Sequence, residues 1–311
     1  MRHRWLTLPC ALLLTLAASA PAVATFPDRN GLIAFSGQTD NGIEIFTMRP
    51  NGHDIRQITN LDGDAINVDW SPDGRRIAFQ LVHEDDVNCD IGIVDADSGN
   101  LQVFDPGSTI CDQWPAFFPD GRMLFERFDS VSGADALWIR NADGSDLHSI
   151  GNGPGLAFSP EVSPDGTRIS FVGWNLLGDP DRQEGLFTMA VDGTDVRWIT
   201  PQQDIFVKQD WAPDGAHLAV TTNAEDRSVA SNILTLRPDG SDVRELTHYA
   251  GADHRAALAS YSPDGQWVLF RLRVADDRAL FRIRPDGSDL HQLTPWSQFI
   301  PLEADWGPAS R

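Results

Sequence analysis

The stretch Trp70-Ser71-Pro72-Asp73-Gly74-Arg75-Arg76-Ile77-Ala78-Phe79 decides the fold, because its combination of Pro-Asp-Gly with a short apolar run after it returns four more times along the chain. The aspartates of successive copies are 47, 45, 49 and 50 residues apart. Proline fixes φ, aspartate bonds the local backbone and glycine accepts a positive φ, so each copy predicts a tight, structural turn. The turn residues of the five copies are Asp73, Gly74, Asp120, Gly121, Asp165, Gly166, Asp214, Gly215, Asp264 and Gly265.

Short apolar runs and a second turn surround each copy. Ile77-Ala78-Phe79 follows the first turn, and a second turn such as Pro238-Asp239-Gly240 leads into one more short strand. Two such runs joined by turn residues predict a hairpin, so each unit should hold four strands and two tight turns. No helical periodicity of useful length lies between them. Four-stranded units of this length are typical of propeller blades.

The two ends of the chain complete one unit together. The N-terminal unit, from Leu32 to Thr59, has three expected strands and lacks the inner one. The C-terminus offers a lone strand, about Leu302 to Trp306, followed by Gly307-Pro308. We therefore predict an all-β, six-bladed β-propeller of four-stranded antiparallel blades, in which this C-terminal strand joins the N-terminal blade. Such closure covers an edge that would otherwise invite aggregation.

The first residues read as a secretory signal. Arg2 and Arg4 precede an apolar run from Leu6 to Ala18, and Ala22-Val23-Ala24 offers a cleavage site. This pattern predicts a cleaved signal peptide over residues 1–24 and a single propeller domain over 25–311. The apolar run is short for a membrane span, and no later stretch is longer or more apolar. A periplasmic or secreted protein without a transmembrane span is expected.

The charge balance excludes some classes of partner. The chain has 45 Asp and Glu against 24 Lys and Arg, a formal net charge of −21. Nucleic-acid binding needs basic side chains to displace counterions, so a nucleic-acid partner is not expected. Such acidity favours solubility as a monomer, cations or a basic partner. Lys208 is the only lysine in the chain.

Cys89 and Cys111 are the two cysteines that remain after the predicted cleavage. An even pair in an exported protein is a candidate disulfide. By the blade topology, one cysteine lies in a long loop within its blade and the other in the next inter-blade loop. Both should fall on the same face of the ring, which makes a bridge geometrically reasonable.

Three Asp-Trp pairs mark the expected inner strands: Asp69-Trp70, Asp210-Trp211 and Asp305-Trp306. Successive side chains of a strand point to opposite faces, so the tryptophans should pack between blades. The aspartates should line the central channel or bond a neighbouring blade. A structural role is the simpler interpretation, since repeat-equivalent positions usually serve packing; a ligand or ion site is the alternative.

Most of the acidic residues fall on one face in this topology. The tight turns lie on one side of the ring, which we call the turn side. The long loops and inter-blade loops lie on the other, which we call the loop face. The acids of the loop face include Glu84, Asp85, Asp86, Asp253 and Glu303. Solvated polar loops are the simple explanation; the functional one is a docking face for a basic partner or cations.

Catalytic and metal-binding motifs are scarce. His248, Asp253 and His254 share one inter-blade loop and are weak candidates for a metal site, with no second cluster to support them. Gly-x-Ser-x-Gly, His-Glu-x-x-His and phosphate-binding glycine loops do not occur. We therefore name no catalytic residue and expect a binding module rather than a self-sufficient enzyme, without a cofactor.

The pattern from Trp70 to Phe79, paired with Arg237 to Thr247, resembles the repeats of TolB-type propellers. The resemblance covers nearly the whole predicted mature chain and implies a protein of the cell envelope that binds other proteins through its propeller. The α/β domain that precedes the propeller in TolB has no counterpart in this sequence. Similar repeats occur in oligogalacturonate lyases. The expected function is thus an exported protein-binding scaffold; the alternatives are a polysaccharide lyase-like enzyme and a sensor of small ligands or calcium.

Overall fold

The computed structural model describes residues 29–83, 88–151, 156–174, 184–199, 208–222 and 228–310. The predicted signal peptide and the acidic run Glu84, Asp85 and Asp86 lie outside these ranges. Every element named within them is a β-strand. The described ranges contain no helix of the length and apolarity that a membrane crossing requires.

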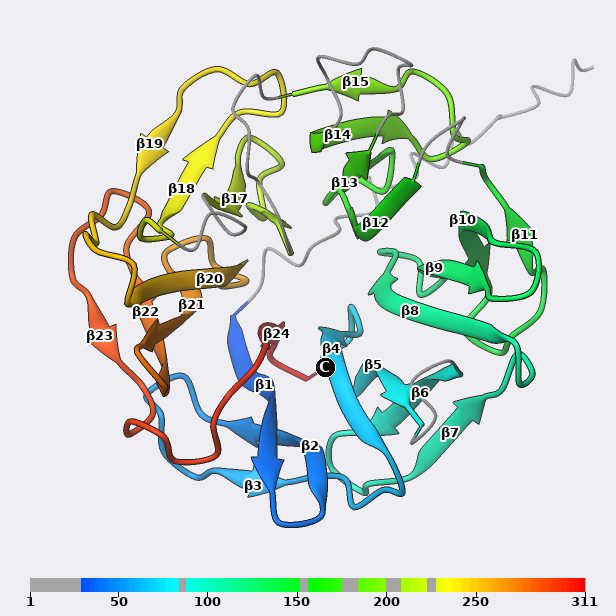
Figure 1. Ribbon diagram of the computed structural model, residues 1–311, viewed down its shortest axis with the longest axis horizontal. Helices are drawn as coiled ribbons and strands as arrows, with labels where there is room; N and C mark the ends of the chain where they lie inside the picture. Colours follow the sequence, from blue (N-terminus) through cyan, green and yellow to red (C-terminus); the bar gives the residue numbers. More distant parts are fainter. Residues whose placement is uncertain are drawn as a thin grey trace, which may run out of the picture.

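Sheets arranged in a ring form an all-β propeller with antiparallel blades (Figure 1). The sheet that joins the two ends of the chain has the order β24-β1-β2-β3. β24 pairs antiparallel with β1, and Trp306 lies opposite Ile33. The predicted closure by the C-terminal strand is therefore confirmed. The bounds are β1 (Asn30–Thr39), β2 (Gly42–Met48), β3 (Arg56–Gln57) and β24 (Ala304–Pro308).

An eight-stranded sheet follows in the sequence. It consists of two antiparallel four-stranded runs that meet at a single parallel pair, Cys89 opposite Cys111. The same two cysteines form a disulfide, as predicted. The strands are β4 (Asp64–Trp70), β5 (Arg76–Val82), β6 (Cys89–Asp95), β7 (Leu101–Phe104), β8 (Ile110–Phe117), β9 (Met123–Asp129), β10 (Ala134–Arg140) and β11 (His148–Ser149).

Three more four-stranded sheets complete the ring, each with a short outer strand. The first contains β12 (Leu156–Val162), β13 (Arg168–Trp174), β14 (Glu184–Ala190) and β15 (Arg197–Trp198). The second contains β16 (Asp210–Trp211), β17 (Leu218–Thr221), β18 (Ile233–Leu236) and β19 (Arg244–Glu245). The third contains β20 (His254–Tyr261), β21 (Val268–Val274), β22 (Asp277–Ile283) and β23 (His291–Gln292).

The tryptophans of the Asp-Trp pairs pack between neighbouring sheets, as expected. Trp70 joins an apolar cluster with Ala34 and Ile45 of the preceding sheet. Trp306 packs in a cluster with Trp267 of β20–β23. Because both tryptophans are almost completely buried, these side chains hold each sheet against the next.

The Pro-Asp-Gly turns have the predicted chemistry. The amide of Gly74 donates to the carbonyl of Ser71 at 2.9 Å, and Gly74 has a φ of 66°. The Asp73 carboxylate accepts from the Ser71 hydroxyl at 2.7 Å and from the Arg75 amide at 3.1 Å. The turn is thus closed by its own backbone and side chains, which is the structural role the sequence indicates.

Substitution of Gly74 by alanine should destabilise the propeller more than the same change at Gly121. Both glycines have a positive φ, 66° and 87°, which costs an alanine about 1 kcal/mol. A Cβ on Gly74 would in addition clash with the carbonyl oxygen of Pro308 at the end of β24, whereas one on Gly121 meets nothing within 4 Å. Urea unfolding of both variants measures the difference, and equal losses would contradict this account of the closure.

Candidate functional site

The inner strands of the sheets share a bulge that shapes the middle of the ring. The pairing register shifts just before Asp69 in β4, before Ala116 in β8, and before Glu161 in β12. In each case the residue two positions earlier has a positive φ, for example 57° at Asn67. Bulges bend a strand and re-aim its side chains. In β4 and β12 the bulge sets the direction of the acidic residue that follows it, Asp69 and Glu161.

The aspartates of the Asp-Trp pairs each clamp two inner strands together. Asp305 Oδ2 accepts from the Trp70 amide at 2.9 Å, and Asp69 Oδ2 accepts from the Phe117 amide at 2.7 Å. Asp210 Oδ2 accepts from the Tyr261 amide at 2.6 Å. All three side chains also line one cavity on the axis. The two alternatives from the sequence, channel lining and bonding to a neighbouring blade, therefore both hold.

Lys208 lies in the same place and is almost completely buried. Its Nζ donates to the Val68 carbonyl at 3.0 Å and lies 3.8 Å from Asp305 Oδ1. Burial by itself lowers the pKa of this ammonium, but nearby carboxylates outweigh it and raise the pKa above the usual lysine value. The lysine is therefore a permanent cation. The axial cluster, as we call it, is Lys208 with Asp69, Glu161, Asp210 and Asp305.

The carboxylates of the axial cluster outnumber its single cation. Burial raises the pKa of Asp69 well above its usual range, and the charge of Asp305 raises it further. Burial and Asp305 likewise raise the pKa of Asp210 to about 7, and burial raises the pKa of Glu161 well above normal. Like charges that share a dry site cannot all ionise. The carboxyl groups of the cluster consequently take up protons at a higher pH than exposed carboxyl groups do.

The cavity beside the axial cluster is small. Its volume is about 30 Å³, and its lining includes Asp69, Glu161, Asp210 and Asp305 together with Tyr261. A water molecule needs roughly 10–15 Å³ of such space, so one or two waters fit. A sugar ring or a peptide does not. This section of the channel is a polar, ionic core that ties the ring together rather than a substrate pocket.

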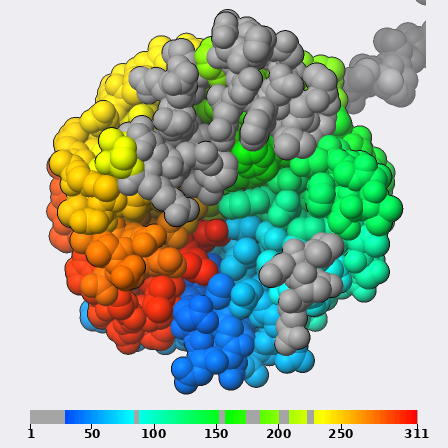
Figure 2. Space-filling view, in the orientation of Figure 1, coloured from blue at the N-terminus to red at the C-terminus, as the bar shows by residue number. Residues whose placement is uncertain are grey.

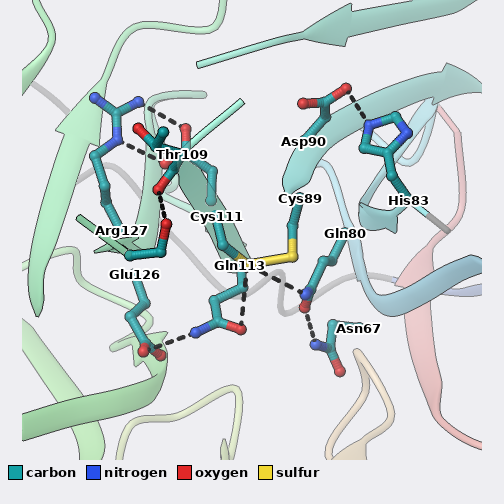
Figure 3. Close-up of a disulfide and its surroundings, with 12 residues drawn as sticks. Asn67, Gln80, His83, Cys89, Asp90, Thr109, Cys111, Gln113, Glu126 and Arg127 are labelled. Carbon is teal, nitrogen blue, oxygen red and sulfur yellow. Dashed lines mark hydrogen bonds and ion pairs between the residues drawn. A yellow bond between two sulfur atoms is a disulfide. The ribbon is translucent and has the colours of Figure 1, made fainter. Parts of the chain in front are cut away.

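The disulfide lies in a second polar network (Figure 3). Beside it, Arg127 binds Asp112 through two hydrogen bonds of 2.6 and 2.7 Å. Gln113 donates to Glu126 at 2.8 Å. Burial raises the pKa of Glu126 well above normal, with the charge of Asp135 adding to it, and burial raises the pKa of Asp135 to about 6. These two acids form a pair that can share a proton.

The other residues named from the sequence are more dispersed. His248 is exposed and faces Glu245 at 3.1 Å, whereas the ring of His254 stacks on Tyr249 with centroids 5.6 Å apart. In the described part of the chain, no three His, Cys, Asp or Glu side chains are grouped closely enough to hold a metal ion. Glu303 lies in the channel. Burial raises the pKa of its carboxyl group, and the positive charges of Lys208 and Arg271 lower that pKa by a smaller amount.

Lys208 and Glu161 were not singled out in the sequence, although the repeat register marks both. Glu161 stands three residues before Pro164, as Asp69 stands three before Pro72. Lys208 stands two residues before Asp210, as Glu303 stands two before Asp305. Alignment of the inner strands on their prolines would have placed both residues on the axis.

Comparison with known proteins agrees with this architecture. The sequence is 30% identical over 139 residues to the Tol-Pal system protein TolB of Nitratidesulfovibrio vulgaris, which covers 44% of this chain and 30% of that protein. It is 29% identical over 202 residues to an uncharacterized protein of Agrobacterium fabrum, covering 62% of this chain and 66% of the other. The chain thus spans only part of the length of these relatives.

Among solved structures, TolB from Acinetobacter baumannii superposes with a TM-score of 0.73 at 19% identity, over 89% of this chain and 67% of that one. At this identity the likeness concerns the fold alone. The family description "TolB beta propeller domain" matches residues 108–310, which is more than half of the sequence. The chain therefore belongs to the TolB β-propeller family.

Proposed function

We propose that this protein is an exported protein-binding scaffold that docks a partner on its loop face and channel mouth. The observation that carries the proposal is the axial cluster, whose cavity of about 30 Å³, among the described residues, has room for water molecules but not for a sugar ring or a peptide at that level of the ring. A ring that is tied together by buried charges at this level offers its outer faces for recognition. Membership of the TolB β-propeller family also supports the proposal of a protein-binding role.

The proposal includes where the mature protein acts and how it is built. We infer cleavage after residue 24 and a single domain over 25–311 with six blades, the eight-stranded sheet counting as two because one parallel pair joins its halves. The Cys89–Cys111 disulfide supports a periplasmic or secreted location, because such bonds persist in oxidising compartments. We propose a monomer with a basic protein partner of the cell envelope, guided by the net charge of −21.

A capture experiment at two salt concentrations tests the docking face. The full chain, immobilised, should retain a partner from envelope extract at about 0.05 M salt and release it at about 0.5 M, where exposed charges are screened. Neutralisation of Glu84, Asp85 and Asp86 to their amides should reduce capture severalfold, since complementary charge steers docking.

The matched control removes three exposed acids of the turn side, Asp54, Asp97 and Asp146, by change to asparagine. It alters the net charge equally and should leave capture unchanged. Equal losses in both triple variants would show only general charge attraction. Failure to recover any salt-sensitive partner would contradict the proposal.

A further inference from the structure

Four arginines gather on one sheet of this acidic protein. Arg255 of β20 lies opposite Arg273 of β21, and Arg273 lies opposite Arg278 of β22. Arg271 stands two residues before Arg273 and so projects from the same face of the sheet. Three adjacent strands thus bring four guanidinium groups to one surface, the face that packs toward β1 and β24.

Little carboxylate charge lies beside Arg271, Arg273 and Arg278 in the described part of the chain. Arg273 has one acidic neighbour, Asp276 at 3.5 Å, whose side chain is fully exposed. Arg271 and Arg278 have no carboxylate oxygen within 4 Å among the residues that the structure describes. Burial, with the charges of Arg278 and the other arginines, lowers the pKa of Arg271 to about 10, although Glu303 opposes the effect. An anion placed here would relieve this repulsion.

A cavity opens at these side chains. Its volume is about 550 Å³, within the range of small-molecule sites, and we call it the arginine cleft. Its lining residues are Ala252, Asp253, Arg255, Arg271, Arg273, Ala275 and Asp276. In Figure 2 the orange atoms of β20–β22 lie beside the red atoms of the C-terminal part of the chain.

Arg271, the most buried of the four arginines, is held in place by a hydrogen bond to the backbone. Arg271 Nη1 donates to the Leu302 carbonyl at 2.9 Å, which fixes the direction of the guanidinium. Its Nε is buried and has no hydrogen-bond partner among the residues that the structure describes. Arg271 also contributes to the lining of the cleft, so its guanidinium is fixed where a ligand in the cleft can approach it.

The segment that carries Leu302 is itself firmly tied. The Ser297 amide donates to the Arg278 carbonyl at 2.9 Å, the Gln38 amide to the Phe299 carbonyl at 2.6 Å, and the Leu302 amide to the Ser36 carbonyl at 2.9 Å. The φ angles of Phe299 and Ile300 are 66° and 39°, values that are strained for a β-branched residue such as isoleucine. Strain of this kind persists where surrounding bonds enforce it, often beside binding sites.

We propose that the arginine cleft binds a small organic polyanion with at least two carboxylate or phosphate groups. The planar fork of arginine matches both groups through paired N–H donors. One anionic group would lie against Arg271 and the next against Arg273 and Arg255, while Asp253 and Asp276 at the rim would turn away longer acidic chains. The cleft opens on the loop face, since Asp253 is part of its lining, and its small anionic ligand is a different occupant from the basic protein partner proposed above.

Titration calorimetry on the full chain at constant ionic strength tests the cleft, with citrate as the carboxylate probe and pyrophosphate as the phosphate probe. Saturable binding of one probe to one site is expected, and the preferred probe identifies the anionic group. The change Arg273→Gln should weaken it about tenfold or more, the usual effect of losing a charge-assisted bond. Arg271→Lys keeps the charge but loses the fork, and should also weaken binding.

The control Arg237→Gln removes an equal charge from a half-exposed arginine of another sheet and should change nothing. Circular dichroism establishes that each variant is folded before it is titrated. Absence of saturable binding by both probes would overturn the proposal. So would equal weakening in Arg237→Gln and Arg273→Gln, because that result would show only general charge attraction.

Discussion

Replacement of Lys208 by methionine should lower the free energy of unfolding by about 3–5 kcal/mol near pH 8, the usual cost of removing one partner from a buried ionic group. Methionine has nearly the volume of lysine, so packing changes little. What is lost is the cation that offsets Asp305, Glu161, Asp69 and Asp210. The measurement is urea unfolding of the natural chain and the variant.

The same variant should recover stability as the pH falls. Burial already raises the pKa values of Asp69, Glu161 and Asp210, and Lys208 lowers each of them, so its loss raises them further. A carboxyl group with a raised folded-state pKa binds more protons in the folded than in the unfolded state, and its contribution is lost as the pH rises. The two folded proteins differ in bound protons only between the pKa of the natural chain, about 7 for Asp210, and the higher pKa of the variant, so the deficit should shrink as the pH falls from 8 to about 7 and change little below that.

An exposed arginine provides the control for this experiment. Arg49→Met removes the same charge from a side chain that is 64% exposed beside Asp54, where an ion pair contributes little. It should cost less than about 1 kcal/mol at either pH. If Lys208→Met were as stable as the natural chain near pH 8, the axial cluster would not be what holds the middle of the ring together.

Removal of the disulfide by the double change Cys89→Ala and Cys111→Ala should cost about 3 kcal/mol of stability. The bond closes a loop of 22 residues, and its loss gives the unfolded chain more conformational freedom. Both cysteines are buried, so alanine also leaves a small packing defect. Thermal and urea unfolding of the oxidised protein and the variant measure the difference.

Reduction of the natural protein should reproduce most of that loss without any substitution. Intact mass after alkylation, with and without prior reduction, counts the free thiols. Two free thiols in the unreduced protein would contradict the bond, and equal unfolding curves with and without reductant would show that it contributes no stability.

Local chemistry made much of the fold predictable. The Pro-Asp-Gly turns depend on the φ of proline and glycine and on short bonds such as Ser71 to Asp73, which few residues can supply. Apolar alternation around them predicted the strands, and the incomplete N-terminal unit predicted pairing with the strand that ends in Asp305-Trp306. The disulfide followed from the same topology, because both cysteines had to lie on one face.

The functional surfaces depended on contacts that no local pattern contains. Lys208 bonds the carbonyl of Val68, 140 residues away, because ring closure alone brings their strands to one axis. The arginine cleft needs the register of β20 and β21, since a shift of one residue would turn the guanidinium groups of one strand to the opposite face. The sequence by itself determined the repeat, its turns and its closure, which are short-range properties of the chain. Only the tertiary structure decided which charges meet and are buried together, because electrostatic energies depend on distance and burial, not on position along the sequence.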